Sequence, residues 1–447
     1  MALLTDQDTI AAISTPPGTG GLAVLRLSGP QALDAITPLF SESDKLRPRQ
    51  AVFGKLNHDR LGEGDFDDCI VTYFKTPHSV TGEDLVEISI HGGAFLQQKL
   101  LGALIESPSV RLAGAGEFTL RAFLNGKIDL SRAEAVADLI HAKDAAAHRN
   151  ARHQIAGSLR SLVASMAEKL TQTLVLIEAE LDFSDQEIDF TPYQALLDPV
   201  LEVKGLTNDL VDTYFYGKRL EEGFRVPIVG SPNSGKSSLF NLLLGHDRAI
   251  VTDQAGTTRD TIEKTAVFAD HTVVFVDTAG IRSADDEAEI SGVDRSIHEI
   301  DRADIILHVS APDTEDPEIN LPTDTPIIKI FNKIDLSPKQ PEGFDLYLSC
   351  LTKEGLKTLK ENIYTHVINT STGGAQGVIL SNERHRDVFL RLSEQLGACE
   401  TAITSELGTE YIASDIRLAL DIIGEITGET TPDDILNQIF EGFCVGK

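Results

Sequence analysis

The stretch Gly230-Ser231-Pro232-Asn233-Ser234-Gly235-Lys236-Ser237 follows a short apolar run and leads into a helical pattern at Ser238-Leu239-Phe240. It fits the phosphate-binding loop pattern, in which a glycine precedes Gly-Lys-Ser at fixed spacing. Glycines let backbone N–H groups turn toward phosphate oxygens, and the following helix N-terminus adds positive potential. We expect Lys236 to reach the β- and γ-phosphates of a nucleotide and Ser237 to bind Mg²⁺. This order of strand, loop and helix predicts an α/β nucleotide-binding domain.

Two further motifs close later predicted strands and identify the nucleotide. In Asp277-Thr278-Ala279-Gly280 the Asp is expected to support Mg²⁺ and the glycine amide to bind the γ-phosphate. In Asn332-Lys333-Ile334-Asp335 the last carboxylate can accept both the N1 and N2 hydrogens of guanine, whereas adenine would present a lone pair to it. Ser349-Cys350-Leu351 is expected to offer a backbone amide to guanine O6. The three motifs together predict GTP.

One feature of small GTPases is missing. They often place a Gln directly after the Asp277–Gly280 type of turn, where it orients the attacking water. Here that position is Ile281. The catalytic water must therefore be handled by another group.

The predicted secondary structure changes along the remaining sequence. Residues 1 to about 120 combine turn clusters with short strands, and a helical pattern begins near Ala94. From Ser131 long helices follow; Ser131 and Glu134 predict a capping box, and apolar residues from Ile155 to Leu181 form one continuous helical stripe typical of a bundle. The strands expected are Leu22–Leu27, Cys69–Phe74, Leu85–Ile90, Arg225–Val229, Thr272–Val276, Asp304–Val309, Pro326–Phe331 and Asp345–Leu348.

Strand–helix alternation from residue 219 to about 370 predicts a parallel sheet covered on both faces. Helical texture returns after the linker-like run at Asn369–Gly374. We therefore predict a multidomain α/β protein: an α+β N-terminal domain, an all-α helical bundle domain, and a P-loop α/β domain inserted into the helical one. The expected N-terminal domain covers residues 1–120. The helical domain is expected in two parts, 121–218 and 378–447, and the inserted domain covers 219–377.

Composition limits the possible functions. The 447 residues carry 39 Lys and Arg against 69 Asp and Glu, a net charge of −30. This balance argues against a protein that coats nucleic acid by bulk electrostatics, but it leaves room for a local basic surface. The four cysteines are too far apart for a disulfide framework or a structural zinc site. With no membrane segment and no signal-peptide pattern, we expect a soluble cytoplasmic protein.

These motifs, taken with Gly256-Thr257-Thr258-Arg259-Asp260 and the terminal Phe443-Cys444-Val445-Gly446-Lys447, resemble the MnmE (TrmE) family of tRNA-modification GTPases. The similarity extends over the whole chain, including Thr15–Ser28 with its Pro-Pro-Gly turn and Gly116–Lys127. It implies a tetrahydrofolate-binding N-terminal domain and a potassium-activated GTPase that works as a homodimer with an FAD-dependent partner, MnmG (GidA), in a heterotetramer or larger complex. GTP hydrolysis would be coupled to dimerisation of the G domains.

The reaction that the resemblance implies modifies C5 of the wobble uridine, position 34, of certain tRNAs. A 5-carboxymethylaminomethyl or aminomethyl group would be formed there, with 5-formyl-tetrahydrofolate or a related tetrahydrofolate as the one-carbon donor. Residues 378–447 carry 13 acids and 5 basic residues. The acidic balance therefore suggests that the partner supplies most of the tRNA-binding surface.

The resemblance also implies residue roles. Thr258 would join Ser237 on Mg²⁺, and Asn233, Thr252, Gln254 and Thr257 would hold K⁺. Glu289 would position the attacking water through a second water, and Cys444 would be required for modification. The folate positions are Arg26, Glu87, Lys127 and Lys447. The further candidates are Arg259 and Asp260 for catalysis, and Ser234, Gly235, Lys236, Ser238, Asp253, Ala255, Gly256, Asp277, Thr278, Ala279, Gly280, Asn332, Lys333, Asp335, Ser349 and Cys350 for nucleotide binding.

Plainer interpretations exist for several of these residues. Without the resemblance, Glu289 reads as a solvated acid, Arg26 and Glu87 as strand-surface residues, and Cys444 as part of a disordered tail. Two alternative functions also fit the motifs: a GTP-switched ribosome-assembly factor, and a folate-dependent one-carbon transferase with an attached regulatory GTPase.

Overall fold

The protein is described by a computed structural model that covers residues 8–182, 192–245, 262–268, 270–277, 299–312, 314, 322–337, 340–369 and 377–446. The chain divides into two compact units. The first comprises Met1–Ala137, Gln154–Ala167 and Leu420–Lys447, and the second comprises Asp138–His153 and Glu168–Ala419. Four helices cross these divisions: α4 (Leu130–His141), α5 (Ala145–Ile155), α6 (Ser158–Asp182) and α12 (Thr409–Thr427).

The first unit is built on a six-stranded sheet with the order β3-β4-β5-β2-β1-β6. All its neighbours are antiparallel except β1 and β6. On β2 the burial alternates, so that Ala23, Leu25 and Leu27 are buried while Leu22 is exposed, as expected for a sheet with one face toward a core. The strands are β1 (Thr9–Ile13), β2 (Leu22–Ser28), β3 (Ala51–Leu56), β4 (Asp67–Phe74), β5 (Leu85–His91) and β6 (Val110–Leu112).

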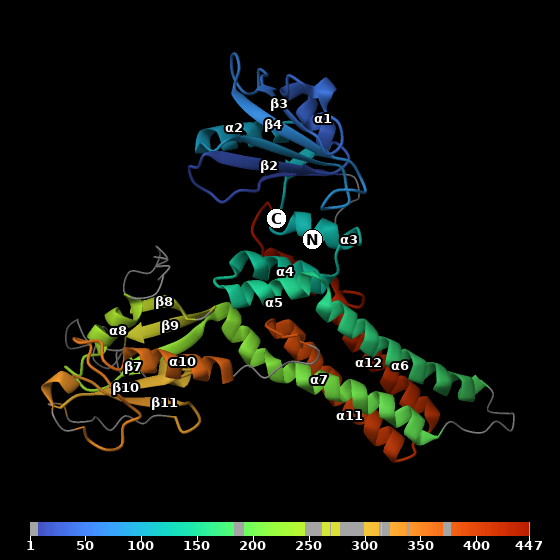
Figure 1. Ribbon diagram of the computed structural model, residues 1–447. Coiled ribbons are helices and arrows are strands. Elements are labelled where there is room, and N and C mark those ends of the chain that lie inside the picture. The colour runs from blue at the N-terminus through green and yellow to red at the C-terminus, as the bar shows by residue number, and fades with distance from the viewer. Residues whose placement is uncertain are drawn as a thin grey trace, which may run out of the picture. The chain divides into compact units, whose positions relative to one another are not determined.

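Helices pack on this sheet and below it (Figure 1). Leu100, Ala103 and Leu104 of α2 (Ala94–Ile105) share one buried cluster with the inner face of the sheet. Leu120 of α3 packs with Leu436 and Phe440 of α13 in a separate cluster. The other helical segments of this part are α1 (Ala32–Ile36), α3 (Glu117–Leu124), α13 (Asp433–Glu441) and the 3-10 turns Thr37–Leu39 and Ser43–Lys45.

A network of ion pairs closes the first unit around α3. Arg121, with only 4% of its side chain exposed, lies 2.7 Å from Asp8, 3.1 Å from Glu83 and 3.0 Å from Glu117. Arg111 reaches Asp8 at 2.6 Å and Glu117 at 2.5 Å. These two guanidinium groups thus tie residues before β1, near β5 and on α3 together, so that the buried charges of Arg121 and Glu117 are paired.

The second unit contains a six-stranded sheet with the order β12-β11-β10-β7-β9-β8, parallel except for β8, which pairs antiparallel with β9. The parallel sheet is confirmed, and β8 is an edge strand that the sequence did not predict. The central β7 is buried almost throughout, because neighbours cover both faces of a parallel sheet. The strands are β7 (Phe224–Val229), β8 (Ile262–Phe268), β9 (His271–Asp277), β10 (Ile306–Ser310), β11 (Ile327–Phe331) and β12 (Leu346–Tyr347).

Helices α7 (Tyr193–Glu222) and α11 (Glu383–Thr404) of the second unit run side by side (Figure 1). Gly217 lets the segment that leads into α11 approach α7 closely, since a Cβ there would lie 1.9 Å from the Leu380 carbonyl oxygen. The end of α7 meets the sheet where the Tyr216 hydroxyl lies 3.0 Å from His271 Nε2. The remaining elements are α8 (Lys236–Leu244), the 3-10 turn Ile334–Leu336 and α10 (Leu356–Asn369).

One local prediction is wrong. Ser131 does not cap α4, which begins at Leu130; instead the Asp129 carboxylate accepts from the Arg132 N–H at 3.1 Å and from the Ser131 hydroxyl at 2.5 Å. The predicted apolar stripe is confirmed from Leu159 to Leu181 along α6, whereas Ile155 lies on α5, before Gly157 with its φ of +92°. The expected strands, by contrast, lie within a residue or two of those observed.

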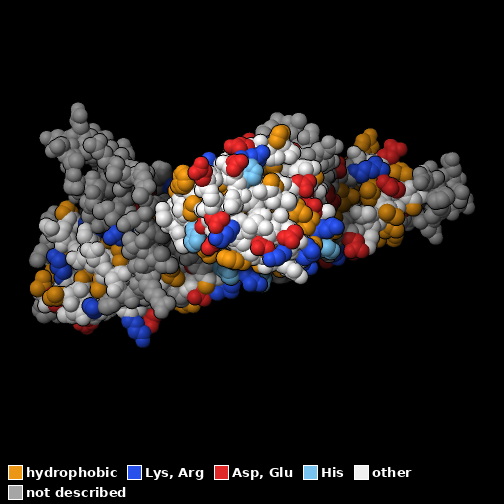
Figure 2. Space-filling model, turned by 90° about the horizontal axis from the view of Figure 1, so that it is seen from above, with side chains coloured by type: hydrophobic (Ala, Val, Ile, Leu, Met, Phe, Trp, Pro, Cys, Tyr) orange, Lys and Arg blue, Asp and Glu red, His pale blue; other side chains and the backbone are white. Residues whose placement is uncertain are grey.

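None of the helices in the described part of the chain combines the length and apolar character that crossing a bilayer requires. Figure 2 shows one face of the molecule. Lys and Arg side chains there lie among Asp and Glu side chains, without a broad patch of one sign.

Acid should weaken the first unit through its buried carboxylates. Burial alone would raise the pKa of Glu117, but hydrogen bonds from Arg111, the Gly114 N–H and Arg121 outweigh it and leave that pKa lowered. The pKa of Asp8 is lowered in the same way. A carboxyl group whose pKa is lowered by folding stabilises the fold at pH values above its unfolded-state pKa of about 4. This stabilisation is lost as the pH falls through the folded-state pKa.

We therefore expect Glu117→Gln to destabilise the protein by about 3 kcal/mol at pH 7, the cost of breaking a buried ion pair. The substitution should also flatten the loss of stability between pH 5 and pH 3, because it removes the carboxyl group that titrates there. Thermal unfolding across that pH range measures the effect. Glu106→Gln, which alters a pair with 57% of the acid exposed, is the control and should leave the curve unchanged. An equal effect of both substitutions would contradict the argument.

Candidate functional site

The phosphate-binding loop lies between β7 and α8 at the carboxyl edge of the parallel sheet, where such folds bind ligands. Gly230 has φ of +143°, and a Cβ there would lie 2.0 Å from the Val309 carbonyl oxygen. Gly235 has φ of +97°, and its Cβ would lie 2.2 Å from Asn332 Nδ2. Asn233 adopts φ of +62°. The loop therefore needs glycine at positions 230 and 235, where φ is positive and a Cβ would clash, and Asn233 is a residue type that tolerates the left-handed conformation.

Polar groups of the loop face inward. The buried Lys236 ammonium donates to the carbonyl oxygens of Gly230 at 2.9 Å and Ser231 at 2.7 Å, so it spans the loop. The buried Ser234 hydroxyl makes no hydrogen bond within the described residues. Lys236 and Ser237 begin α8, where the first N–H groups of the helix have no intrahelical partner. A cradle closed to a Cβ, a spanning cation and an orphaned hydroxyl fit a bound phosphate chain.

Asn332 connects this loop to the second half of the site. Its side chain is 1% exposed; Nδ2 donates to the Ser234 carbonyl oxygen at 2.9 Å, and Oδ1 accepts from the Cys350 N–H at 3.3 Å. One amide thus fixes the loop after β7 and the loop after β12 from its own position after β11. Losing it would leave two buried partners unsatisfied, each at a cost of about 1–3 kcal/mol.

Asp335 lies beside the loop that follows β12. Its Oδ1 accepts from the Ser349 hydroxyl at 2.5 Å, and the Ser349 oxygen accepts from the Thr352 N–H at 3.2 Å. Asp335 is exposed and Ser349 fully buried. Burial raises the pKa of the Cys350 thiol to about 11, so this side chain stays neutral and its backbone amide serves the site. An oriented carboxylate next to backbone amides suits the edge of guanine.

Several predicted site residues lie outside the described residues, and their roles stay predictions. The Asp277 backbone ends β9 at the same edge of the sheet, although its side chain is not described. The residues outside are Thr252, Asp253, Gln254, Ala255, Gly256, Thr257, Thr258, Arg259, Asp260, Thr278, Ala279, Gly280, Glu289 and Lys447. Among the described residues, the structure brings together Asn233 to Ser238 with Asn332, Lys333, Asp335, Ser349 and Cys350 around one edge.

The folate candidates of the first unit meet only in part. Arg26 on β2 and Glu87 on β5 are register partners, and the Arg26 guanidinium lies 2.6 Å from the Glu87 carboxylate. Their side chains are 21% and 30% exposed on the outer face of the sheet. The Lys127 ammonium instead donates to the Pro77 carbonyl oxygen at 2.8 Å. The pair is thus placed for a ligand on the sheet, while Lys127 makes a contact of its own.

The C-terminal tail lies against the N-terminal fold rather than apart from it. The Gly116 N–H donates to the Cys444 carbonyl oxygen at 3.3 Å, and Val445 pairs with Ala115. Gly446 has φ of +91°, and a Cβ there would lie 2.3 Å from the Ile13 carbonyl oxygen at the end of β1. Cys444 itself is exposed. Residue spacing had given no reason for these contacts, although the glycine at position 446 was a usable signal.

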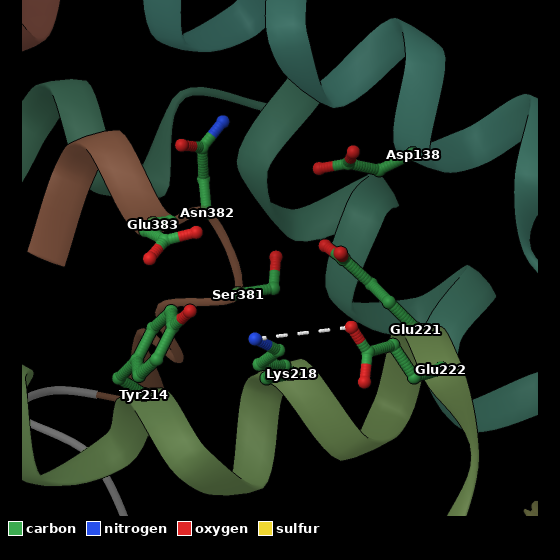
Figure 3. Close-up of a pocket in the computed structure, with 8 residues that line it drawn as sticks. All are labelled: Asp138, Tyr214, Lys218, Glu221, Glu222, Ser381, Asn382 and Glu383. Atoms are coloured by element: carbon green, nitrogen blue, oxygen red, sulfur yellow. Dashed lines mark ion pairs between the residues drawn. The ribbon is translucent and has the colours of Figure 1, made fainter.

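A hollow of about 270 Å³ lies in the second unit, away from the phosphate loop. Figure 3 shows the carboxylates of Asp138, Glu221, Glu222 and Glu383 around it, with Lys218 paired to Glu222 at 3.8 Å. Burial raises the pKa of Glu221. The hollow lies at the end of α7 and at the residues Ser381–Glu383 that lead into α11. Its negative charge makes it unsuitable for a phosphate.

The family of the chain follows from comparison with known proteins. The family model for the GTP-binding protein TrmE N-terminus matches residues 9–127, and the model for the MnmE helical domain matches residues 130–444. The chain belongs to the MnmE family. Two relatives are named tRNA modification GTPase MnmE. The one from Legionella pneumophila is 39% identical over 98% of this chain and 99% of its own length. The one from Clostridioides difficile is 38% identical over 99% of this chain and 99% of its own length.

A third MnmE relative, from Christiangramia forsetii, is 37% identical over 99% of both chains. Among solved structures, the G domain of the T. maritima FeoB iron transporter matches 33% of this chain and 99% of its own, with 23% identity and a TM-score of 0.25. The full-length relatives support a GTP hydrolase that acts in tRNA modification.

The base-recognition loop allows a direct test of nucleotide choice. Asp335→Asn removes the carboxylate that accepts two guanine hydrogens and supplies an amide that can donate to the O2 carbonyl of xanthine. We expect affinity for GTP to fall roughly 100-fold or more and affinity for xanthosine triphosphate to rise. Equilibrium binding of the two nucleotides measures the ratio. Asp324→Asn, at an exposed acid elsewhere in the unit, is the control, and an unchanged ratio in Asp335→Asn would refute the assignment.

Proposed function

We propose that this protein binds and hydrolyses GTP at the loop Gly230–Ser237 and uses the cycle to form the C5 group of the wobble uridine of certain tRNAs. The partner would be an FAD-dependent protein of the MnmG (GidA) kind, in a heterotetramer or larger complex. The observation that carries the GTP assignment is the Asn332 bridge between the phosphate loop and the guanine loop. Full-length similarity to tRNA modification GTPases supports the tRNA substrate.

In hydrolysis, Lys236 and the N–H groups at the start of α8 would bind the β- and γ-phosphates. Ser237, Thr258 and Asp277 would hold Mg²⁺, which neutralises phosphate charge when bound. Glu289 would position the attacking water through a second water, because Ile281 cannot do so. Thr258 and Glu289 lie outside the described residues, so sequence similarity alone supports their roles. Arg259 and Asp260 remain candidates in the same segment.

K⁺ would supply the positive charge that other GTPases obtain from an arginine finger. Of its four proposed ligands, Asn233 is described; it sits in the left-handed region at the turn of the loop, next to the buried Ser234. Thr252, Gln254 and Thr257 complete the proposed set. Dimerisation of the G domains would then accompany hydrolysis, with the homodimer as the working form.

For the one-carbon step we propose that a tetrahydrofolate binds on the outer face of the first sheet. The support is the partly exposed pair of Arg26 and Glu87, because a ligand carrying both a carboxylate and hydrogen-bond donors can exchange with a paired cation and anion. The tail contacts at Gly116 and Ile13 support a role for Cys444 near this domain. We also retain the domain boundaries 1–120, 121–218, 219–377 and 378–447 as a proposal.

Potassium dependence tests the cation assignment. GTP turnover should rise roughly 100- to 1,000-fold in K⁺ compared with Na⁺, the size expected for one electrostatic group in the transition state. Asn233→Ala should remove most of this difference while GTP still binds. Steady-state phosphate release in matched chloride salts measures it. The control is Asn241→Ala, at an exposed position on α8, which should keep the potassium response; equal wild-type rates in both salts would exclude the proposal.

The tail cysteine separates modification from hydrolysis. In cells that lack this protein, the wild-type chain should restore the modified wobble uridine, whereas Cys444→Ser should not, with GTP turnover unchanged because Cys444 lies outside the phosphate loop. Nucleoside analysis of bulk tRNA measures the product. Val445→Ile, a conservative change at the neighbouring exposed residue, should behave as wild type. Full restoration by Cys444→Ser would refute the role of the thiol, and no restoration by wild type would refute the function.

A further inference from the structure

The outer face of α5 is unusual for so acidic a protein. His148, Arg149, Arg152 and His153 are exposed, and Lys143 is exposed just before the helix. At spacings of one, four and five residues, the four helical side chains share one face. The opposite face consists of small residues, and Ala146, Ala147 and Ala151 are buried. We call these five basic residues the α5 face.

Acidic residues are scarce in the sequence that contains the α5 face. No Asp or Glu occurs from Ala145 to Ala167, although the whole chain has 69 of them. The nearest acid in sequence, Asp144, is turned inward: its carboxylate accepts from the Ala147 N–H at 2.8 Å and from the Thr272 N–H at 2.6 Å. Lys143 and Arg152 have no ion-pair partner within the described residues.

Arg149 is the member of the α5 face with a close acid, since it lies 3.2 Å from Asp270. Both side chains are more than half exposed, at 57% and 61%. Such surface pairs contribute little and exchange readily with another anion. The face can therefore offer Arg149 to an incoming ligand as well.

Other cations at the surface of the second unit, some only partly exposed, are arranged differently. Several have an acid on the same or a facing helix within ion-pair distance, which cancels their charge locally: Lys169 with Glu202, Lys204 with Glu400, Lys357 with Glu361 and Arg417 with Glu178. Because the Debye length is about 8 Å in physiological salt, distant acids are screened and the local excess decides what binds at the α5 face.

The α5 face is also held rigidly. Ala146 and Ala147 belong to the core cluster of the parallel sheet, together with Phe224 and Val273. The Ala146 N–H donates to the Asp270 carbonyl oxygen at 3.1 Å. These contacts fix the helix on the β8–β9 side of the sheet (Figure 1). A preordered set of cations binds an anion with a smaller entropic cost than a mobile tail would.

We propose that the α5 face binds the phosphate backbone of the substrate tRNA. This inference rests on the proposed function, which makes tRNA the substrate. Protein partners are favoured by apolar anchors; residues 141–153 contain no large apolar side chain, and Ile140, just before them, is a single exposed one. Arg, Lys and His donors on one helix face, without an apolar centre, instead match phosphate oxygens. The face supplies this chain with an RNA contact despite its net charge of −30.

The test compares two double variants that remove the same net charge. Lys143→Gln with Arg152→Gln neutralises the α5 face, whereas Lys357→Gln with Arg417→Gln neutralises two exposed cations elsewhere in the unit. Binding of the full-length protein to a tRNA with a wobble uridine is measured by fluorescence anisotropy at several NaCl concentrations, with K⁺ held constant. GTP turnover is measured for each variant and should stay at the wild-type value.

We expect the α5 variant to lose on the order of tenfold in tRNA affinity per phosphate contact removed, with the slope of log affinity against log salt shallower by roughly one unit per contact. The control variant should keep the wild-type affinity and slope. Equal losses in both variants, an unchanged slope in the α5 variant, or no salt-dependent binding by wild type would overturn the inference. Loss of partner-protein binding with tRNA affinity intact would also overturn it.

The outcome is distinguishable from failure of the function itself. If wild type restores the modified uridine in deficient cells and the α5 variant binds tRNA as wild type does, only the α5 inference fails. If wild type restores no modification, the proposed function fails regardless of the anisotropy result.

Discussion

A single buried amide holds the candidate nucleotide site together. Asn332 lies after β11, yet it donates to the loop after β7 and accepts from the loop after β12. Parallel strands bring these loops to one edge of the sheet, and the amide then sets their separation. Because Asn332 is 1% exposed, water cannot replace either bond, so the spacing between phosphate loop and base loop is fixed wherever the sheet is intact.

The first unit follows the same principle with charges and close backbone contacts. Arg121 and Arg111 gather three acids from separate segments, and the low exposure of Arg121 and Glu117 makes these two depend on their partners. Gly446 lets the C-terminal tail approach the Ile13 carbonyl oxygen more closely than a Cβ would permit. Gly116 does the same for the approach of its own backbone to the Phe440 carbonyl oxygen. Cys444 is thereby held at the N-terminal fold, which connects the tail to the proposed one-carbon chemistry.

Charge gives different information on different length scales. The total of −30 argues against binding nucleic acid through bulk electrostatics, which is an expectation about the average surface. It does not hold for α5, whose small buried face packs on the sheet while its cations point outward. Most of the tRNA surface can still come from a partner, with α5 as a contact of this chain.

The sequence by itself determined the nucleotide motifs, the parallel sheet and the family, because glycine spacing, strand–helix alternation and short motifs are local properties of the chain. It misplaced the cap of α4 at Ser131, since Ser, Asp and Glu nearby could each serve, and packing selected Asp129. It also placed Ile155 in the same stripe as Leu159, although Gly157 separates α5 from α6 at that point. Only the tertiary structure decided that Asn332 bridges two loops, that Arg26 pairs with Glu87, and that the tail lies against β1. Those contacts join residues far apart in sequence, and their distances depend on how the strands are ordered and packed.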